Sequence, residues 1–404
     1  MTQERLNKII ESHQHYLNKD IDGWESMRAD LSYKNLSGLD LSNANLYRVN
    51  LRKANLRDAN LRDANLSCAN LRKADLSSAD LNKADLAYAD LRNANLRGAN
   101  LREADLSCAN LRKADLSSAD LNKADLTYAD LRKADLRNAD LREADLRKAD
   151  LRNADLGKAD LSRADLRNAE LSEANLRNAN LSNADLAYAD LAYADLRNAD
   201  FKDANLRNAN LSNANLRKTD LADADLSNAY LRETDLCRAF CCYANLYKAN
   251  LKDADLSEAN LYGANLKDAN LFGANLKNVN IINAKISKDT KIDYPITCPD
   301  TGSFIGYKKA AYEKIVKLQI CEDAKRSSAI GKKCRCSKAL VLAIENIDES
   351  DSGLQEIESI YDPSFVYRVG EIAEEPDFDD NRWYECAPGI HFFMDRQDAV
   401  DYEF

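Results

Sequence analysis

The sequence predicts a mainly β protein built as a solenoid, and three features of a repeat predict it. Leu or a close substitute occupies every fifth position from Leu31 to Ile286, which makes 52 consecutive pentapeptides. Ala stands two places before most of these residues, and Asp or Asn stands one place before them. Gly and Pro are scarce, at 12 and 5 of 404 residues, so we expect tight-turn chemistry to play no part in this regularity.

A period of five fits neither a regular helix nor a regular strand. Five residues rotate a helix by about 500°, so its Leu side chains would point in all directions. In a continuous strand an odd period would send alternate Leu residues to opposite faces. A chain that turns once in every five residues buries them all, because Ala and Leu lie two apart in a short extended segment and face the same side. Small Ala beside large Leu suits a narrow interior.

The repeat, of the form A-[D/N]-L-x-x, resembles that of the pentapeptide-repeat family over roughly residues 29–286. The resemblance implies a right-handed quadrilateral β-helix with four pentapeptides in each coil. It therefore implies about 13 coils and, at about 4.8 Å for each coil, a rod of roughly 60 Å. The segments 66–90 and 106–130 differ at one position, and their offset of 40 residues equals two coils.

The N-terminal residues 1–28 are predicted to form a capping helix and its lead-in. Stacked coils expose an apolar cross-section and unpaired strand edges, so the first coil needs a cover. Segment 4–17 has apolar residues at helical spacing, namely Leu6, Ile9, Ile10, Tyr16 and Leu17. His13 and His15 lie on different sides of such a helix, and we expect them to face solvent or pack in the cap rather than bind a metal.

A small α+β domain is predicted at residues 291–404, after a β-helix at 29–290. Its expected elements are strands near 303–308, 314–320, 338–347 and 365–372, a helix at 396–403 and an acidic loop at 371–380. The stretches CEDAKRSSAIGKKCRCSKALVL, FDDNRWYECAPGIHFF and MDRQDAVDY resemble an uncharacterised domain that follows pentapeptide repeats in bacterial and viral proteins.

Charge is distributed unevenly along the chain and, if residues 20 apart stack, around the coil. Residues 31–290 carry a net charge of +1 and residues 291–404 a net charge of −9, within a total of −10. One predicted column is basic and has flanking lysines: Arg52, Arg72, Arg92, Arg112, Arg132, Arg152, with Lys53, Lys73, Lys113 and Lys133. A second is acidic: Asp85, Asp105, Asp125, Asp145, Asp165 and Asp185. A third alternates tyrosines with small residues: Tyr88, Tyr128, Tyr188, Cys68 and Cys108.

These columns permit two interpretations, and the sequence leaves both open. Arg and Asp on neighbouring corners can form a mesh of exposed ion pairs. Alternatively, the basic column docks an anionic partner, either an acidic protein surface or nucleic acid. Nucleic acid is the less favoured form, because aromatic residues do not interleave with that column. We therefore predict a non-enzymatic interaction scaffold or rigid spacer that presents the C-terminal domain, with an unidentified protein partner and no cofactor.

Two further functions are considered for comparison. Some proteins of the resembled family bind DNA gyrase as mimics of duplex DNA and confer fluoroquinolone resistance. Such mimicry needs a predominantly negative rod, whereas this repeat sums to +1. An enzymatic C-terminal domain is the other alternative, and it would need a pocket with convergent polar groups, with Arg326, Glu385 and His391 as candidates.

The C-terminal domain also contains two sets of residues with possible binding roles. The thiolate and imidazole candidates for zinc are Cys298, Cys321, Cys334, Cys336, Cys386 and His391. They lack paired C-x₂-C knuckles, so we predict buried free thiols and no metal. A basic cluster consists of Lys325, Arg326, Lys332, Lys333, Arg335 and Lys338. It suits phosphate or nucleic acid, but we expect it to pair with the carboxylates of its own domain.

The N-terminal segment is polar and has no apolar core of a signal peptide. No run of about 18 apolar residues predicts a transmembrane helix. Ten cysteines without an export signal are typical of reduced thiols, so a cytoplasmic location is expected.

Overall fold

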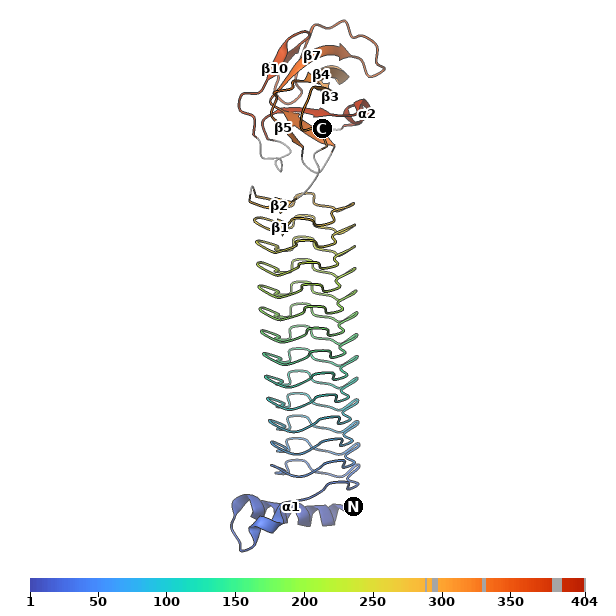
Figure 1. Ribbon diagram of the computed structural model, residues 1–404. Coiled ribbons are helices and arrows are strands. Elements are labelled where there is room, and N and C mark those ends of the chain that lie inside the picture. The colour runs from blue at the N-terminus through green and yellow to red at the C-terminus, as the bar shows by residue number, and fades with distance from the viewer. Residues whose placement is uncertain (288, 293–296, 329–331, 380–386, 403–404) are drawn as a thin grey trace. The chain divides into compact units, whose positions relative to one another are not determined.

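The structure is a computed structural model that describes residues 1–287, 289–292, 297–328, 332–379 and 387–402. The chain forms two compact units, Met1–Asp293 and Tyr294–Phe404, and Figure 1 labels several elements of each. Among the described residues, no helix is long and apolar enough to cross a membrane.

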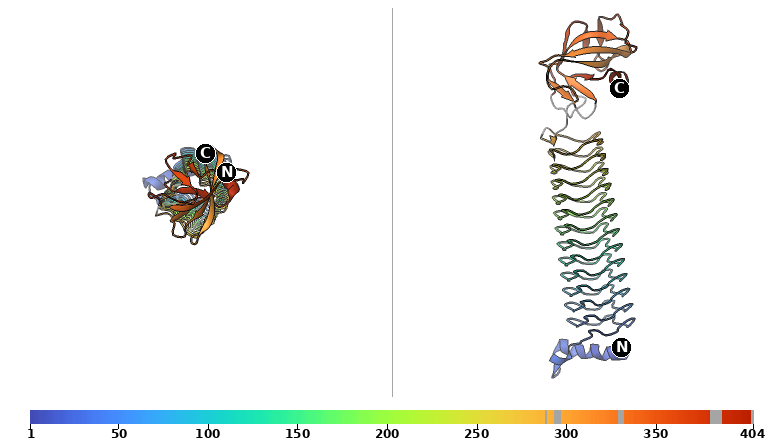
Figure 2. Two further views of the ribbon diagram at one scale, coloured as in Figure 1. Left: turned by 90° about the horizontal axis from the view of Figure 1, so that it is seen from above. Right: turned by 45° about the vertical axis from the view of Figure 1, so that its right-hand side comes forward.

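The first unit is a β-helix in which one coil takes 20 residues. Parallel bridges join residues 20 apart from Asp30↔Asn50 to Asn265↔Lys285, so four pentapeptides complete each coil. Figures 1 and 2 show the coils stacked one on the next. Near the end of the unit, the short strands β1 (Asn270–Leu271) and β2 (Lys291–Ile292) pair in parallel.

Each pentapeptide turns through a tight β-turn. In one example, the Ala134 N–H donates to the Leu131 carbonyl at 2.9 Å, and Lys133 between them has a φ of +60°. A positive φ at the second central position is characteristic of type II turns, in which Gly is usual. Here Gly takes that position only at residues 38, 98, 263 and 273 among the described pentapeptides. The expectation that tight-turn chemistry plays no part is therefore wrong, because the turns form with non-glycine residues.

Hydrogen bonds between coils explain how so many residues are held in this unfavourable conformation. The Lys133 N–H donates to the Arg152 carbonyl of the next coil at 3.1 Å. On the other side of the turn, the Asp130 carboxylate accepts from the Arg132 N–H at 3.2 Å. Each turn thus satisfies its backbone donors within the stack, and this offsets the cost of a left-handed residue.

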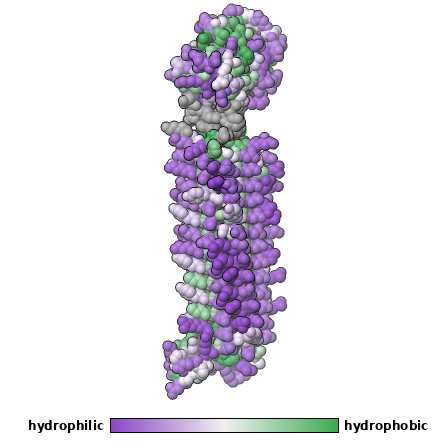
Figure 3. Space-filling view, viewed as in Figure 1, coloured by the Kyte–Doolittle hydropathy of each residue, from purple (hydrophilic) through white to green (hydrophobic). Residues whose placement is uncertain are grey.

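Ala and Leu line the interior, as the repeat predicts. Leu131 has no exposed surface and Ala134 retains 2% of its surface, and the same pattern runs through the repeat. Phe201, which replaces a Leu, is also fully buried. Where Thr219 replaces an Ala, its hydroxyl donates to the Leu216 carbonyl at 2.6 Å, so the interior holds no unpaired hydroxyl there. The outer surface of the coils is mostly hydrophilic (Figure 3).

The predicted N-terminal helix is confirmed as α1 (Gln3–Asn18), which is followed by the 3₁₀ helix η1 (Trp24–Met27). The helix contacts the first coils: Gln3 Nε2 donates to the Asp40 carbonyl at 2.7 Å, and Leu6 is fully buried. His13 is also buried, as a cap-packing residue. Its Nδ1 accepts from the Ala29 N–H at 3.2 Å, so Nε2 carries the proton and donates to the Tyr47 carbonyl at 3.0 Å.

The second unit contains a seven-stranded antiparallel sheet with the order β10-β7-β4-β3-β11-β6-β5. In chain order its strands are β3 (Phe304–Ala310), β4 (Lys314–Ile320), β5 (Arg326–Ser328), β6 (Lys333–Cys336), β7 (Lys338–Glu345), β10 (Ile372–Glu374) and β11 (Ile390–Phe393). The 3₁₀ turn η2 (Ala311–Glu313) joins β3 to β4. A two-stranded sheet of β8 (Glu356–Glu358) and β9 (Val366–Arg368), and the short helix α2 (Arg396–Val400), complete the unit.

Three of the expected strands correspond to β3, β4 and β7. The expected strand at 365–372 is two strands, β9 and β10, because the chain turns at Gly370, where φ is +85°. The expected acidic loop at 371–380 contains β10, and residue 380 lies outside the described residues. Strands β5, β6, β8 and β11 were not predicted, since three or four residues carry too weak an alternation to detect. The expected helix at 396–403 ends earlier, at Val400.

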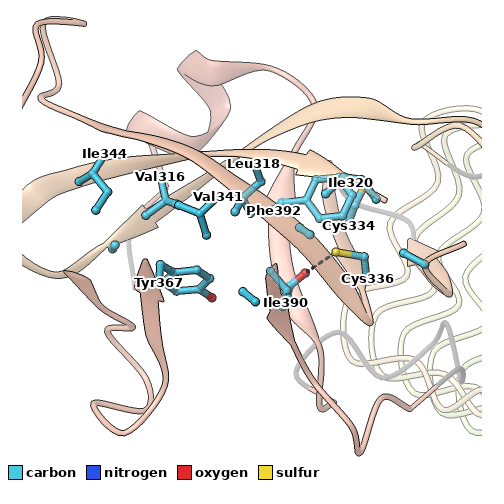
Figure 4. Packing of buried hydrophobic residues seen from close by; sticks show 14 of the residues in the cluster. Val316, Leu318, Ile320, Cys334, Cys336, Val341, Ile344, Tyr367, Ile390 and Phe392 are labelled. Atoms are coloured by element: carbon cyan, nitrogen blue, oxygen red, sulfur yellow. Dashed lines mark hydrogen bonds between the residues drawn. The ribbon is translucent and has the colours of Figure 1, made fainter. Parts of the chain in front are cut away.

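The core of this unit lies on one face of the seven-stranded sheet. Figure 4 shows Tyr367 of β9 packed near Val316 and Val341 of the large sheet and beside Ile390 of β11. The β8–β9 pair therefore covers this face. Ala399 of α2 forms a second, smaller hydrophobic cluster with residues from β4 and β11.

Candidate functional site

The six arginines of the predicted basic column lie in successive coils. Backbone hydrogen bonds connect each coil to the next at this position, for example from the Lys53 N–H to the Arg72 carbonyl at 2.9 Å and from the Lys73 N–H to the Arg92 carbonyl at 3.1 Å. Each arginine follows a Leu and is the first central residue of its turn. The turn directs it outward, and the residue after it, a lysine in four cases and an asparagine in two, takes the left-handed position, as at Lys133 and Asn153.

Part of the charge on this column is neutralised locally. Three arginines hold the Asp of their own pentapeptide through two N–H groups, as in the pairs Arg92–Asp90, Arg132–Asp130 and Arg152–Asp150. The hydrogen bonds that Arg132 donates keep the pKa of the Asp130 carboxyl below its ordinary value, although burial opposes them. Arg112 differs, since no carboxylate among the described residues lies within ion-pair distance of it. Arg52 instead donates to the Tyr33 hydroxyl at 3.0 Å.

The remaining positive charge is concentrated on one side of the coil. We define the basic face as residues 50–53, 70–73, 90–93, 110–113, 130–133 and 150–153. It holds ten Lys and Arg against three Asp, a net charge of +7. On the other three sides, the equivalent residues of six coils, from 55–58 to 165–168, hold four cations against five carboxylates, six against seven, and three against five. Their net charges are −1, −1 and −2, so the basic face is distinct from its neighbours.

Ion pairs do form a mesh, but not between neighbouring corners as expected. Arg147 pairs with Asp145 of its own pentapeptide at 2.5 Å and with Asp165 of the next coil at 3.6 Å. The residues before and after one Leu project outward from the same short segment, so their side chains meet on one side of the coil. The mesh therefore runs along the stack. Parallel bridges connect the predicted acidic column in succession: Asp85, Asp105, Asp125, Asp145, Asp165 and Asp185.

Exposed tyrosines form the third predicted column. Tyr88, Tyr128 and Tyr188 are 66%, 58% and 63% exposed. Lys148 in the coil after Tyr128 donates to its hydroxyl at 2.9 Å. A hydrogen bond with Cys108 raises the pKa of the Tyr88 phenol. Large aromatic side chains on a polar surface are typical of contact sites. The predicted alternation with small residues holds only as far as Tyr128, because Lys148 and Asn168 separate Tyr128 from Tyr188, and the tyrosines form no continuous patch.

The second unit has a pocket of about 380 Å³ that the sequence only partly indicated. Of the three residues suggested for an enzymatic site, His391 lines this pocket. Arg326 does not, because its guanidinium donates to backbone carbonyls, among them Gly302 at 2.5 Å and Cys321 at 2.7 Å. Glu385 lies outside the described residues. The pocket is instead lined by Lys308 and Tyr367, which sequence analysis did not single out.

The cysteines of the second unit belong mainly to its core. Cys298, Cys334 and Cys336 are buried and have free thiols. A hydrogen bond between the thiols of Cys298 and Cys334 lowers the pKa of Cys298 and raises the pKa of Cys334. The described residues contain no group of three or more potential metal ligands, and Cys386 lies outside them.

The basic cluster of the second unit pairs with its own domain, partly in an unexpected way. Lys332 binds Asp398 at 2.5 Å and Lys338 binds Asp323 at 2.7 Å, as expected. Arg335, by contrast, donates to the carbonyls of Asp379 and Pro388, both at 3.1 Å. Arg335 is almost fully buried, where a guanidinium can satisfy several acceptors at once, backbone carbonyls included.

Two family models match the chain. One, for pentapeptide repeats, matches successive segments between residues 27 and 287. The other, described as a family of unknown function (DUF5758), matches residues 294–399. No protein with curated annotation matches the chain.

Several solved pentapeptide-repeat structures are similar to it. HetL of the cyanobacterium Nostoc, which is involved in regulating heterocyst differentiation, is 33% identical over 67% of this chain and 92% of its own, with a TM-score of 0.18. Rfr23 of the cyanobacterium Cyanothece is 38% identical over 26% of this chain and 64% of its own, with a TM-score of 0.13. QnrB1, a plasmid-mediated fluoroquinolone resistance protein, is 18% identical over 50% of this chain and 94% of its own, with a TM-score of 0.23. Because the repeat model spans more than half of its length, this chain belongs to the pentapeptide-repeat family.

Proposed function

We propose that this protein is a non-enzymatic scaffold whose basic face binds an acidic protein surface. The observation that carries the proposal is the net charge of +7 on one side of six coils, against −1, −1 and −2 on the other three. At about 4.8 Å for each coil, the face extends for about 24 Å, which is several Debye lengths at physiological ionic strength. A partner with matching carboxylates would therefore be attracted to this side of the rod alone.

The stacking of the coils supports recognition of side chains that are held at regular intervals along the rod. Inter-coil hydrogen bonds hold the turn at Lys133 against the turn one coil further on, and this fixes the position of its backbone along the rod. Lys73, Arg112 and Lys133 are exposed and form no ion pair with a described residue, so they are available to a partner. The finer features of the proposal are a right-handed rod of about 13 coils, a role as a rigid spacer for the C-terminal domain, and a cytoplasmic location.

A direct test reverses charges that hold no internal ion pair. The test variant is Lys73→Glu/Arg112→Glu/Lys113→Glu/Lys133→Glu. The matched control is Arg97→Glu/Lys158→Glu/Arg163→Glu/Lys218→Glu, which changes the same total charge at four exposed residues off the basic face that likewise form no ion pair with a described residue. Fluorescent poly-glutamate serves as the acidic probe, and its binding is followed by anisotropy from 50 to 200 mM salt.

We expect the test variant to bind poly-glutamate at least about 10-fold more weakly than the unchanged protein, and the control to lose much less. Equal loss in both variants would show that only the overall charge matters, which contradicts the proposal. A duplex DNA of 20 base pairs is measured in parallel. If it binds with a steep salt dependence and poly-glutamate does not bind, the partner is nucleic acid and the proposal is wrong.

Gyrase binding by DNA mimicry is the weaker alternative. The basic face has the wrong sign for a mimic of duplex DNA, and the arginine–carboxylate pairs neutralise much of the acidic column beyond Asp125. We therefore expect no inhibition of gyrase supercoiling at micromolar protein. Inhibition would replace the scaffold proposal with this alternative.

A further inference from the structure

The pocket of the second unit lies where the β8–β9 pair meets the large sheet. Its volume is about 380 Å³, within the range of small-molecule sites. Three aromatic residues, Tyr361, Phe365 and Tyr367, provide much of its wall. The polar residues that line it are Lys308, Lys333, Ser359, Asp362, Glu375, Asp377 and His391.

Lys308 is an unusual residue for its position. Along β3, burial alternates so that Gly306, Lys308 and Ala310 lie on the buried side of the strand. Ala310 belongs to the hydrophobic core, and Lys308 is only 6% exposed to solvent. The neighbouring Lys309 is different, because its ammonium binds Glu313 at 3.0 Å and the Val400 carbonyl at 3.2 Å.

The Lys308 ammonium has no such partner. Among the described residues it makes no hydrogen bond and no ion pair, although three carboxylates line the same pocket. The ammonium lies over the Tyr367 ring, 5.7 Å from the ring centroid. A buried ammonium without a partner costs several kcal/mol, so the group is driven toward the neutral amine. Burial, followed by the charge of Lys333, lowers the pKa of Lys308 to about 8.

These features match the chemistry of a nucleophilic lysine. An amine becomes nucleophilic at neutral pH when it is desolvated or placed beside another cation, and both conditions hold at Lys308, which is almost fully buried and feels the charge of Lys333. Burial also raises the pKa of the Tyr367 phenol, so that this hydroxyl stays protonated. A permanent anion site is the other use of a buried ammonium, but Asp362, Glu375 and Asp377 line the same pocket and repel anions.

We propose that the pocket binds a small aldehyde or ketone and that Lys308 condenses with it. The neutral amine nitrogen attacks the carbonyl carbon to form a carbinolamine. The carbinolamine then loses its hydroxyl and the nitrogen-bound hydrogen as water, which leaves a C=N bond to Nζ. No oxidant, reductant or metal is consumed. The aromatic walls favour a carbonyl compound with an apolar or aromatic body.

The experiment traps this adduct in the full-length protein. The protein is incubated with benzaldehyde and cyanoborohydride, which reduces the C=N bond to a stable secondary amine, and peptide mass spectrometry gives the labelling rate at each lysine. At pH 8 about half of an amine with a pKa near 8 is neutral, against roughly 0.4% of an ordinary lysine. We expect Lys308 to be labelled at least about 10-fold faster than the exposed Lys325, the internal control.

The pH profile gives an independent readout. The Lys308 rate is expected to rise with a midpoint near pH 8, well below the midpoint of an ordinary lysine. The titratable and charged groups around Lys308 are Lys333 and Cys336 of β6, Tyr367 of β9, and Asp362, Glu375, Asp377 and His391 of the pocket. Of these, the phenol of Tyr367 stays protonated throughout the profile and cannot produce a midpoint near 8.

Lys308→Met is the variant control, because it replaces the buried ammonium by an apolar chain of similar length. It should remove the fast labelling and leave the Lys325 rate unchanged. The proposal is overturned if Lys308 in the folded, unchanged protein is labelled no faster than Lys325. It is also overturned if fast labelling persists in Lys308→Met, since another residue would then carry it.

Discussion

The left-handed turn position allows the backbone of the repeat to be tested apart from its side chains. Lys133 has a φ of +60°, is exposed, and makes no side-chain hydrogen bond or ion pair with a described residue. A residue with a Cβ costs about 1–2 kcal/mol more than Gly in this conformation. Gly loses about 0.5–1 kcal/mol more in chain entropy on folding. The net expectation is that Lys133→Gly stabilises the protein by about 0.5 kcal/mol.

Lys133→Val should have the opposite effect. A β-branched side chain at positive φ is a genuine outlier, and strain of this kind costs about 1–3 kcal/mol. The Gly and Val variants should therefore differ by about 2 kcal/mol in free energy of unfolding. A double variant, Lys73→Val/Lys133→Val, changes two turns three coils apart, about 14 Å, so its cost should be close to the sum of the two.

Urea unfolding followed by circular dichroism measures these differences. Arg112→Val is the matched control, because Arg112 lies on the same face, is exposed and unpaired, and occupies the first turn position, where φ is not positive. We expect it to stay within about 0.5 kcal/mol of the unchanged protein. The reasoning is refuted if Lys133→Val is as stable as Lys133→Gly, or if Arg112→Val is destabilised as much as Lys133→Val.

Two further predictions concern the interior and the cap. Leu131→Ala should lower the free energy of unfolding by about 3–5 kcal/mol, since inter-coil hydrogen bonds keep the cavity from collapsing, whereas Arg132→Ala should cost about 1 kcal/mol or less by the same urea assay. Burial lowers the pKa of His13, so the unfolded state binds a proton first as pH falls below 6.5. The docked α1 should therefore be most stable above pH 6.5 and lose stability below it, as amide exchange of α1 would record. His15→Gln should leave this dependence unchanged, while unaltered protection of α1 down to pH 5 would contradict the role of His13.

A signal for the turns was present in the sequence but was not used. From Tyr33 to Asn283, the second residue after each Leu is never Val, Ile or Thr, whereas Thr127 and Ile282 occur one place earlier. Exclusion of β-branched residues at one position of a repeat indicates a left-handed backbone there. The scarcity of Gly concealed this, because Asn, Lys, Tyr and acidic residues take the role instead.

The pocket could not be predicted in the same way. Within the strand FIGYKKA, Lys308 alternates with its neighbours so that it lies on the same face as Gly306 and Ala310. A lysine at such a position usually pairs with a carboxylate. Whether it has a partner depends on β9 and on the residues around Pro388, which are far away in the sequence. Likewise, the pairing of Arg147 with Asp165 requires the stacking of coils, and the backbone partners of Arg335 come from distant loops.

The sequence by itself determined the β-helix, because a hydrophobic period of five repeated 52 times leaves only a chain that turns at every fifth residue able to bury each Leu. Which residues share a side of the coil followed from the family resemblance, which implied four pentapeptides in each coil, and the bridges between residues 20 apart agree with it. Only the tertiary structure decided which charges are paired between coils, and that Lys308 is buried with no hydrogen-bond or ion-pair partner among the described residues. The pairing of charges and the burial of Lys308 depend on contacts between segments that no local period specifies. The coils of the repeat, in contrast, stack on neighbouring coils of the same sequence pattern.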